Sequence, residues 1–251
     1  MYTESKVVSL IAVRLKSTRL PQKALLPLQG RPVLWHLVDR IGRAKIPQEK
    51  VICTSTVKED DPIAGFAEEY GFPVFRGSPK NVLLRFLKAA EEYKADHIVR
   101  ITGDNPLTDA FLIDEMIKLH LDQNADYTYT EDTPRGTKPE VISLKAVKRA
   151  LELAENPDHS EYMTFYFKHY PDVFHHAKYN YPHEDYIRPS YRLTLDTKGD
   201  YDVLTKVYAS LYCSNPEFTM LDVIQFLDNH PEVISLNKTV APKTYPALML
   251  N

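Results

Sequence analysis

The chain has 251 residues, a length at which one large domain or two small ones can bury a sizeable core. Hydrophobic residues make up 43% and charged residues 26%, the balance of a folded globular protein, which excludes a disordered or collagen-like chain. The formal net charge of -3 gives no overall positive field for a phosphate backbone, so no nucleic-acid partner is expected.

The apolar runs, the N-terminus and the cysteines bear on localisation. The run from Val7 to Val13 is far shorter than the roughly 20 residues of a membrane span, and residues 1–4 lack the basic start of a signal peptide. Only Cys53 and Cys213 are present, too few for a disulfide framework. We expect a cytoplasmic protein without a membrane partner.

Strand and helix patterns alternate along the first half of the chain. A β-branched apolar run predicts a strand at 6–13, and after a polar loop a helical pattern follows at 32–41. The same pair recurs at 51–54 and 62–70, at 73–75 and 81–93, and at 97–101 and 109–123. Four such units predict an α/β fold with a parallel, doubly wound sheet covered on both faces.

The second half is predicted to be mixed. Strands are expected at 140–142, 174–181 and 191–195, and helices at 144–154, 161–168, 200–212 and 220–230. His120 and His230 fall near predicted helix ends, where a cation is favourable. Residues 1–235 are expected to form a single domain and residues 236–251 a C-terminal tail.

The loop after the first predicted strand carries four cations and two hydroxyls in residues 14–23, and no glycine. Phosphate loops built on backbone amides need glycines, so side chains would have to supply the charge here. Arg14, Arg19 and Lys23 together can neutralise a triphosphate. The alternative is a solvated basic loop, but ligands of open α/β sheets bind at the carboxyl ends of strands, where this loop lies.

Two carboxylates also follow predicted strands. Asp104 stands in a Gly-Asp-Asn-Pro turn, where it can hold a magnesium ion or cap the next helix. Asp196 follows the segment 191–195 and can reach the same ion, which favours the metal role. Asp200 is expected to cap the helix that begins beside it.

Four ordered motifs carry a family resemblance. They are residues 14–28, Arg76-Gly-Ser78, Thr102-Gly-Asp-Asn-Pro-Leu107 and Arg192-Leu-Thr-Leu-Asp196. In this order and spacing the sequence resembles the cytidylyltransferases that include the CMP-Kdo and CMP-sialic acid synthetases, and most of all their spore-coat polysaccharide branch. The resemblance implies a Rossmann-like, three-layer nucleotidyltransferase fold with a mixed, mostly parallel sheet and a small insertion or dimerisation element.

The resemblance also implies an activity and a site. The activity would be Mg²⁺-dependent transfer of CMP from CTP to a sugar acid or a phosphorylated small metabolite, with release of pyrophosphate, in surface polysaccharide or glycoconjugate biosynthesis, by a homodimer. Arg14 and Lys23 would be catalytic, and Asp104 and Asp196 would hold the metal. Glu140 and Arg192 would bind the acceptor. The nucleotide would contact Ala12, Val13, Arg14, Ser17, Arg19, Lys23, Arg76, Ser78, Thr102 and Asp104.

Some positions depart from the family pattern. Gln22 stands where relatives have glycine, and only glycine adopts positive φ freely, so the phosphate loop is expected to be stiffer or redirected. Leu84 and Tyr162 also differ from the family pattern, and Glu140 could instead simply begin an exposed strand.

Two other function classes compete with the cytidylyltransferase. A nucleotide-sugar glycosyltransferase of the GT-A type shares the nucleotide-binding half, but its usual Asp-x-Asp is not matched at Asp104. A catalytically silent nucleotide-binding protein would be expected to lose catalytic cations, whereas Arg14 and Lys23 are both present.

Overall fold

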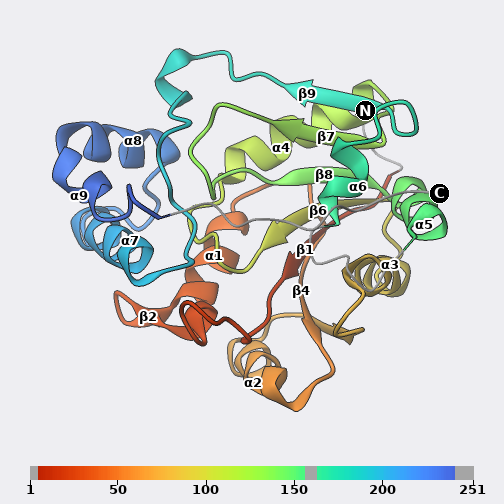
Figure 1. Cartoon of the computed structure of the whole chain (residues 1–251), viewed down its shortest axis with the longest axis horizontal. Coiled ribbons are helices and arrows are strands. Elements are labelled where there is room, and N and C mark those ends of the chain that lie inside the picture. Colours follow the sequence, from red (N-terminus) through yellow and green to blue (C-terminus); the bar gives the residue numbers. More distant parts are fainter. Residues whose placement is uncertain (1–4, 156–162, 241–251) are drawn as a thin grey trace.

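The fold is built on a seven-stranded sheet, seen in a computed structural model that describes residues 5–155 and 163–240. The strand order is β5-β4-β1-β6-β8-β7-β9 (Figure 1). The bounds are β1 (Val7–Ala12), β4 (Glu49–Ser55), β5 (Val74–Gly77), β6 (His97–Thr102), β7 (Tyr127–Thr130), β8 (Glu140–Ser143) and β9 (His176–Tyr179). Every strand except β8 runs in the same direction, so the sheet is mixed and mostly parallel.

Helices cover both faces of this sheet. On one face lie α1 (Val33–Ile41), α2 (Asp61–Tyr70) and α4 (Ala110–Asp122), and on the other α3 (Val82–Glu92), α5 (Leu144–Leu153) and α6 (Thr164–Lys168). Successive residues of a strand point to opposite faces, so Val7 and Ile11 of β1 enter the first core while Val8 and Leu10 enter the second. The predicted three-layer α/β architecture is confirmed.

A third core lies beside the sheet. It is formed by α7 (Lys198–Leu211), α8 (Met220–Asn229) and α9 (Pro231–Ser235), which gather at one side of the molecule, away from α3 and α5 (Figure 1). Two residues that follow the parallel strands are buried among these helices: Leu28, from the segment between β1 and α1, and Leu107, from the loop after β6. The third core therefore packs against the carboxyl edge of the parallel strands.

The short elements follow from local turn chemistry. The hairpin of β2 (Pro27–Leu28) and β3 (Arg31–Pro32) turns through Gln29 and Gly30, both at positive φ, as a two-residue hairpin loop requires. Single 3-10 turns occur at η1 (Lys23–Leu25), η2 (Lys58–Asp60) and η4 (Glu184–Tyr186).

The four predicted strand–helix units are all present, and the second half differs in detail. The strand predicted at 191–195 is wrong, because this segment makes only an isolated bridge between Arg135 and Arg192 and bonds to loop backbone instead. Strand β7 was not predicted, and β9 is shorter than the predicted 174–181. Helix α6 begins at Thr164, and the start of the helix predicted at 161–168 lies outside the described residues.

One residue-level prediction is confirmed and another is corrected. Asp200 does cap α7, as the first-turn member of a capping box in which Thr197 is the N-cap residue. His120 lies in the last turn of α4 as predicted, but its side chain is fully buried and burial lowers its pKa to about 3, so it is neutral and not a helix-end cation. Among the described residues, no helix has the length and apolar character to cross a membrane.

Candidate active site

Lys23 lies between two carboxylates that are far apart in the chain. Its Nζ is 2.6 Å from Asp104 Oδ2 and 2.8 Å from Asp196 Oδ1. Lys23 lies in the basic loop after β1, and Asp104 lies in the turn after β6. Asp196 lies two residues before the start of α7. The predicted basic loop and both predicted metal ligands therefore converge on one point at the carboxyl edge of the sheet.

Two arginines complete this cluster. Arg19 and Arg192 both reach Asp196 Oδ2, at 3.2 and 2.8 Å. Arg192 also donates through Nε to Asp200 Oδ1 at 2.8 Å, and Asp200 accepts the backbone N–H of Asp196 at 3.0 Å. Asp200 is fully buried, so it fixes both the backbone and the arginine partner of Asp196.

The electrostatics keep Lys23 charged. Burial by itself lowers the pKa of an ammonium, but Asp104 and Asp196 outweigh that penalty, and the pKa of Lys23 is raised. The charge of the ammonium is thus balanced by both carboxylates at hydrogen-bond distance.

The same carboxylates fit a divalent cation. Their oxygens converge on one atom, and Mg²⁺ prefers hard oxygen ligands, commonly one or two carboxylates completed by water and phosphate. Within the described part of the chain no cluster of three or more His, Cys, Asp or Glu side chains is arranged for a metal. Asp104 and Asp196 would therefore hold the ion jointly with its nucleotide.

Backbone contacts explain how the two carboxylates meet. The N–H of Gly103 donates to Ala12 O at 2.8 Å, and a Cβ at Gly103 would lie 2.6 Å from Val13 Cβ, so only glycine lets β6 end this close to β1. The N–H of Leu195 donates to Asp104 O at 2.8 Å, which brings Asp196 beside Asp104.

Gln22 adopts a backbone conformation that glycine adopts more freely than any other residue. Its φ of 53° and ψ of 23° are left-handed, and it directly precedes Lys23 at the start of η1. This conformation is strained for a residue with a side chain, so Gln22 holds local backbone strain directly beside Lys23.

The remaining predicted nucleotide-binding residues make contacts with other segments. Arg14 of the basic loop donates to Pro79 O in the loop after β5 at 3.3 Å, and in that same loop Ser78 Oγ accepts the N–H of Asn81 at 3.0 Å. Arg76 turns to the end of β4 and pairs with Asp61 at 2.6 Å. Thr102 Oγ1 accepts Asn105 Nδ2 at 2.7 Å, and Ser17 Oγ accepts the N–H of Leu20 at 3.4 Å.

The end of β1 is tied into the sheet. The carbonyl of Ala12 accepts from Gly103, and the N–H of Val13 donates to Cys53 O at 3.2 Å. These two backbone groups, which belong to residues expected to contact the nucleotide, are therefore engaged with neighbouring strands.

Glu140 lies apart from the Lys23 cluster, on β8. It begins that strand, as one interpretation held, but it is buried and not exposed. Its carboxylate pairs with Arg100 Nη1 at 2.6 Å and Lys168 Nζ at 3.3 Å, and it accepts a hydrogen bond from the hydroxyl of Tyr127. Although burial opposes its charge, Arg100 and Lys168 lower the pKa of Glu140 to about 2.

Sequence reasoning missed Asp60. It is buried, its Oδ1 accepts the N–H of Leu15 at 2.8 Å, and its Oδ2 accepts the hydroxyl of Ser55. Asp60 thus anchors the start of the basic loop to the end of β4. The Asp-Asp-Pro run at 60–62 could have been recognised as the start of a helix, but nothing local indicates its contact with Leu15.

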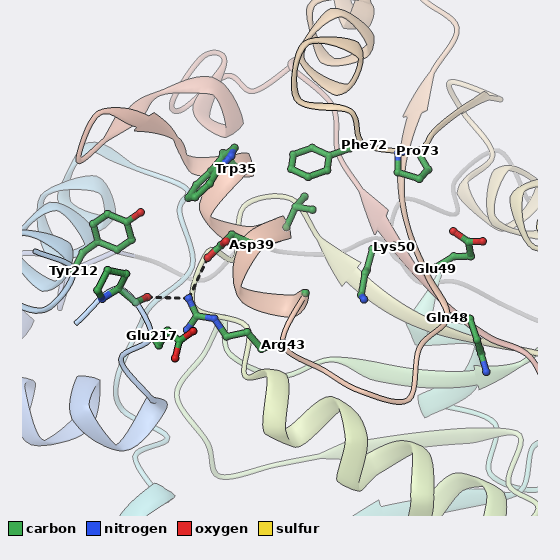
Figure 2. Close-up of a pocket in the computed structure, with 13 residues that line it drawn as sticks. Trp35, Asp39, Arg43, Gln48, Glu49, Lys50, Phe72, Pro73, Tyr212 and Glu217 are labelled. Atoms are coloured by element: carbon green, nitrogen blue, oxygen red, sulfur yellow. Dashed lines mark hydrogen bonds and ion pairs between the residues drawn. The ribbon is translucent and has the colours of Figure 1, made fainter. Parts of the chain in front are cut away.

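One cavity lies away from the Lys23 cluster, and a second borders it at Arg192. The first, of about 700 Å³, is at the opposite edge of the sheet, between the end of α1 and the starts of β4 and β5. There Arg43 bonds to Asp39 and to Pro216 O (Figure 2), and none of the predicted site residues lines it. A second of about 460 Å³ includes Arg192 in its lining, but the Arg192 guanidinium is committed to Asp196 and Asp200.

Parallel strands whose carboxyl ends carry clustered cations and carboxylates define a nucleotide-binding α/β protein. The sequence model of the cytidylyltransferase family matches residues 8–225, so this chain belongs to the cytidylyltransferase family and is a nucleotidyltransferase.

Individual relatives agree over nearly the whole chain. The spore coat polysaccharide biosynthesis protein SpsF of Bacillus subtilis is 36% identical over 233 residues, 90% of this chain and 95% of that protein. An uncharacterized protein of Methanocaldococcus jannaschii is 35% identical over 240 residues, 96% and 98% of the two chains. The structure of a cytidylyltransferase from Leptospira borgpetersenii matches with a TM-score of 0.87 at 30% identity, over 95% of this chain and 100% of that chain. The predicted family and fold are confirmed.

Proposed function

We propose that the protein is a Mg²⁺-dependent cytidylyltransferase that transfers CMP from CTP to a sugar acid or a phosphorylated small metabolite and releases pyrophosphate. The observation that carries this proposal is the ammonium of Lys23 held between Asp104 and Asp196 at the carboxyl edge of the sheet. This arrangement offers a cation for phosphate oxygens and two carboxylates for a metal ion within one small volume.

The proposed reaction needs no covalent intermediate on a protein side chain. Transfer to an acceptor oxygen depends on in-line positioning and on positive charge near the phosphate oxygens. Lys23 and Arg19 would neutralise the triphosphate, and Arg14 would approach it from the side of Pro79. When bound between Asp104 and Asp196, Mg²⁺ would supply further charge stabilisation at the α-phosphate.

The remaining predicted residues take their roles from the family resemblance or from their contacts. By the resemblance, the base and ribose would be surrounded by Ala12, Val13, Arg76, Ser78 and Thr102. Arg192, predicted to bind the acceptor, is held by Asp196 and Asp200, so we assign it the positioning of Asp196.

We further propose that residues 1–235 act as a single domain followed by a tail, that the enzyme works in the cytoplasm, and that it forms a homodimer. The single domain is supported by the burial of Leu28 and Leu107, from sheet-edge loops, among α7–α9. A role in surface polysaccharide biosynthesis is supported by the similarity to SpsF.

The test is pyrophosphate release with each of the four nucleoside triphosphates, with and without Mg²⁺, against a panel of sugar acids and phosphorylated metabolites, with mass detection of the product. Mg²⁺-dependent release with CTP and one acceptor is expected. Sugar transfer from a preformed nucleotide sugar would favour a glycosyltransferase, and CTP binding without release would favour a silent binding protein.

Two variants test the site itself. Lys23→Ala and Asp104→Asn should each reduce turnover by about 100-fold or more, the loss that follows when a transition-state charge partner is removed. Lys16→Ala, an exposed lysine of the same loop, is the matched control and should keep near wild-type turnover. Wild-type turnover in both site variants, with circular dichroism showing intact folds, would refute the assignment.

A further inference from the structure

The segment that follows α9 reaches the charge cluster at the edge of the sheet. Asn237 belongs to the stretch that the sequence predicted as a C-terminal tail, but its side chain is buried. Its Nδ2 donates to the carbonyl oxygen of Arg192 at 2.9 Å and to Asp200 Oδ1 at 2.9 Å. The two hydrogens of this amide therefore each have an acceptor, one before and one after Asp196 in the sequence.

Asn237 contributes to the hydrogen bonding of the fully buried carboxylate of Asp200. Oδ1 of Asp200 accepts from Asn237 Nδ2 and from Arg192 Nε. Oδ2 accepts the backbone N–H groups of Asp196 and Thr197, at 3.0 and 2.8 Å. A carboxylate away from water stays charged only when donors of this kind replace the water. Asn237 thus supports the group that holds the backbone of Asp196.

Asp200 and Asp196 also share one guanidinium. Arg192 donates through Nε to Asp200 Oδ1 and through Nη2 to Asp196 Oδ2, both at 2.8 Å. Burial opposes the charge of Arg192, but the two carboxylates outweigh it and raise the pKa of this arginine. Because Arg192 holds Oδ2 of Asp196, a shift of Asp200 would turn the Asp196 carboxylate as well as move its backbone.

A glycine allows the C-terminal segment to approach α7 closely. Gly199 lies in the first turn of α7, and a Cβ at this position would lie 2.5 Å from the carbonyl oxygen of Leu236. Any side chain at residue 199 would therefore push Leu236 and Asn237 away from α7. The two hydrogen bonds of Asn237 depend on this close approach.

We propose that Asn237 is a positioning residue for the metal site, which holds Asp200 and Arg192 so that the Asp196 carboxylate keeps the orientation in which it binds a divalent cation. This inference rests on the proposed function and goes beyond it, because it makes the segment after α9 a determinant of metal affinity. The two hydrogen bonds of Asn237 end at Arg192 and Asp200, so its effect on Asp196 passes through these residues. Replacing a residue that orients a metal ligand commonly costs roughly ten-fold or more in metal affinity.

Binding of Mn²⁺ tests the proposal without turnover. The full chain, as wild type and as Asn237→Leu, is titrated with Mn²⁺ in the presence of CTP and without acceptor, and binding is followed by electron paramagnetic resonance. A matching titration of CTP alone corrects for Mn²⁺ held by free nucleotide. Leucine has a branched side chain of similar shape and no donor, so we expect the Mn²⁺ dissociation constant to rise about ten-fold. CTP affinity without metal should be unchanged.

Three further variants complete the titration. Asn229→Leu makes the same substitution at an exposed position at the end of α8 and should bind Mn²⁺ as wild type does. Gly199→Ala displaces Leu236 from the side of α7 and should weaken Mn²⁺ binding as Asn237→Leu does. If Asn237→Leu does not fold, Asn237→Ser, which is smaller and keeps one donor, takes its place and should also raise the dissociation constant.

Kinetics and stability separate metal positioning from a purely structural role. With an accepted substrate, the Mg²⁺ concentration that gives half-maximal turnover should rise about ten-fold in Asn237→Leu, whereas turnover at saturating Mg²⁺ should stay within about two-fold of wild type. A variant that loses stability in urea but keeps the Mn²⁺ affinity of wild type would show that Asn237 only supports the fold, and would overturn the proposal.

The outcomes also distinguish this inference from the proposed function. Weaker Mn²⁺ binding by Asn237→Leu, in a protein that forms no CMP product, would support the positioning role and refute the cytidylyltransferase assignment. CMP transfer by a protein in which Asn237→Leu leaves Mn²⁺ affinity unchanged would refute the positioning role alone. No binding of Mn²⁺ by wild type with CTP would overturn both the metal site and this inference.

Discussion

The ammonium of Lys23 occupies the point at which the carboxylates of Asp104 and Asp196 converge, so a divalent cation and this ammonium compete for the same oxygens. In the protein without nucleotide, a metal ion must displace Lys23 before it can bind. We therefore expect Lys23→Met, which keeps the length of the side chain and removes its charge, to bind Mn²⁺ at least ten-fold more tightly than wild type. Titration followed by electron paramagnetic resonance, without nucleotide, measures this difference.

Lys16→Met provides the comparison for that titration. Lys16 is an exposed residue of the same loop, so its loss changes the net charge equally and leaves Asp104 and Asp196 as they are. Its Mn²⁺ affinity should match that of wild type. Equal Mn²⁺ affinities in wild type and Lys23→Met would show that the ammonium does not compete with the metal ion for Asp104 and Asp196.

Gln22 gives a stability prediction at the same loop. A left-handed conformation costs a non-glycine residue roughly 1–2 kcal/mol, whereas glycine loses more chain entropy on folding, which offsets part of the gain. Gln22→Gly should therefore raise the free energy of unfolding by about 0.5–1 kcal/mol, measured by urea denaturation.

A glycine placed on a regular helix should have the opposite effect. Gln225 is exposed on α8, where glycine is unfavourable, so Gln225→Gly should lower the free energy of unfolding by about 1 kcal/mol. If Gln22→Gly destabilises as much as Gln225→Gly, the backbone at Gln22 is not strained.

At the scale of elements, β6, α4 and β7 are joined by two histidines. His120 of α4 lies 3.0 Å from His97 Nδ1 of β6 and 2.8 Å from Thr128 Oγ1 of β7. Burial is the main cause of the lowered pKa of both histidines. The pKa of His120 is lowered further by the charges of His97, Lys145 and His175, and Asp126 raises it in part. Folding therefore keeps His120 neutral where the unfolded chain protonates it.

The sign of the pH dependence follows from this difference. Between the unfolded value of about 6.5 and the folded value of about 3, the unfolded state binds more protons, so the free energy of unfolding falls as pH falls. His120 alone contributes a slope of up to about 1.4 kcal/mol per pH unit. Denaturation between pH 7 and 5.5 measures it above the range in which Glu140, whose pKa falls from about 4.5 in the unfolded chain to about 2 in the folded protein, begins to contribute.

A substitution isolates this contribution. His120→Gln stays neutral at every pH and should flatten the slope between pH 6.5 and 5.5. His183→Gln, at an exposed position, should keep the wild-type slope. A slope that is unchanged by His120→Gln would assign the acid sensitivity to other groups.

At the scale of the whole molecule, local patterns predicted the parallel half and its edge. The sequence pattern of β1 is local: its apolar side chains Val7, Val8, Leu10 and Ile11 divide between the two faces of the sheet. The loops after β1 and β6 are likewise marked by their own residues. Both features could therefore be predicted from the sequence. Strand β7 was missed although its Tyr-Thr-Tyr-Thr sequence is typical of a strand. The strand predicted at 191–195 is wrong because the residue pattern of an extended segment predicts a strand even when no neighbouring strand forms a ladder with it.

The chemistry of the site was predictable in part for the same reason. Residue types and their place after strands indicated Lys23, Asp104 and Asp196, and these three do meet. The engagement of Arg192 by Asp200, and of Glu140 by Arg100 and Lys168, depends on packing between distant segments. Side-chain partners of that kind leave no local pattern.

The contact between Lys23 and Asp196 joins residues 173 positions apart. Contacts so distant in sequence form late, because the intervening chain must first be ordered. During synthesis from the N-terminus, the sheet through β9 can assemble while Asp196 is still being made. A nascent chain therefore carries the basic loop and Asp104 without the second carboxylate, and the complete charge cluster arises only when α7–α9 dock. Full-length synthesis is thus a condition for a finished site as well as for a finished third core.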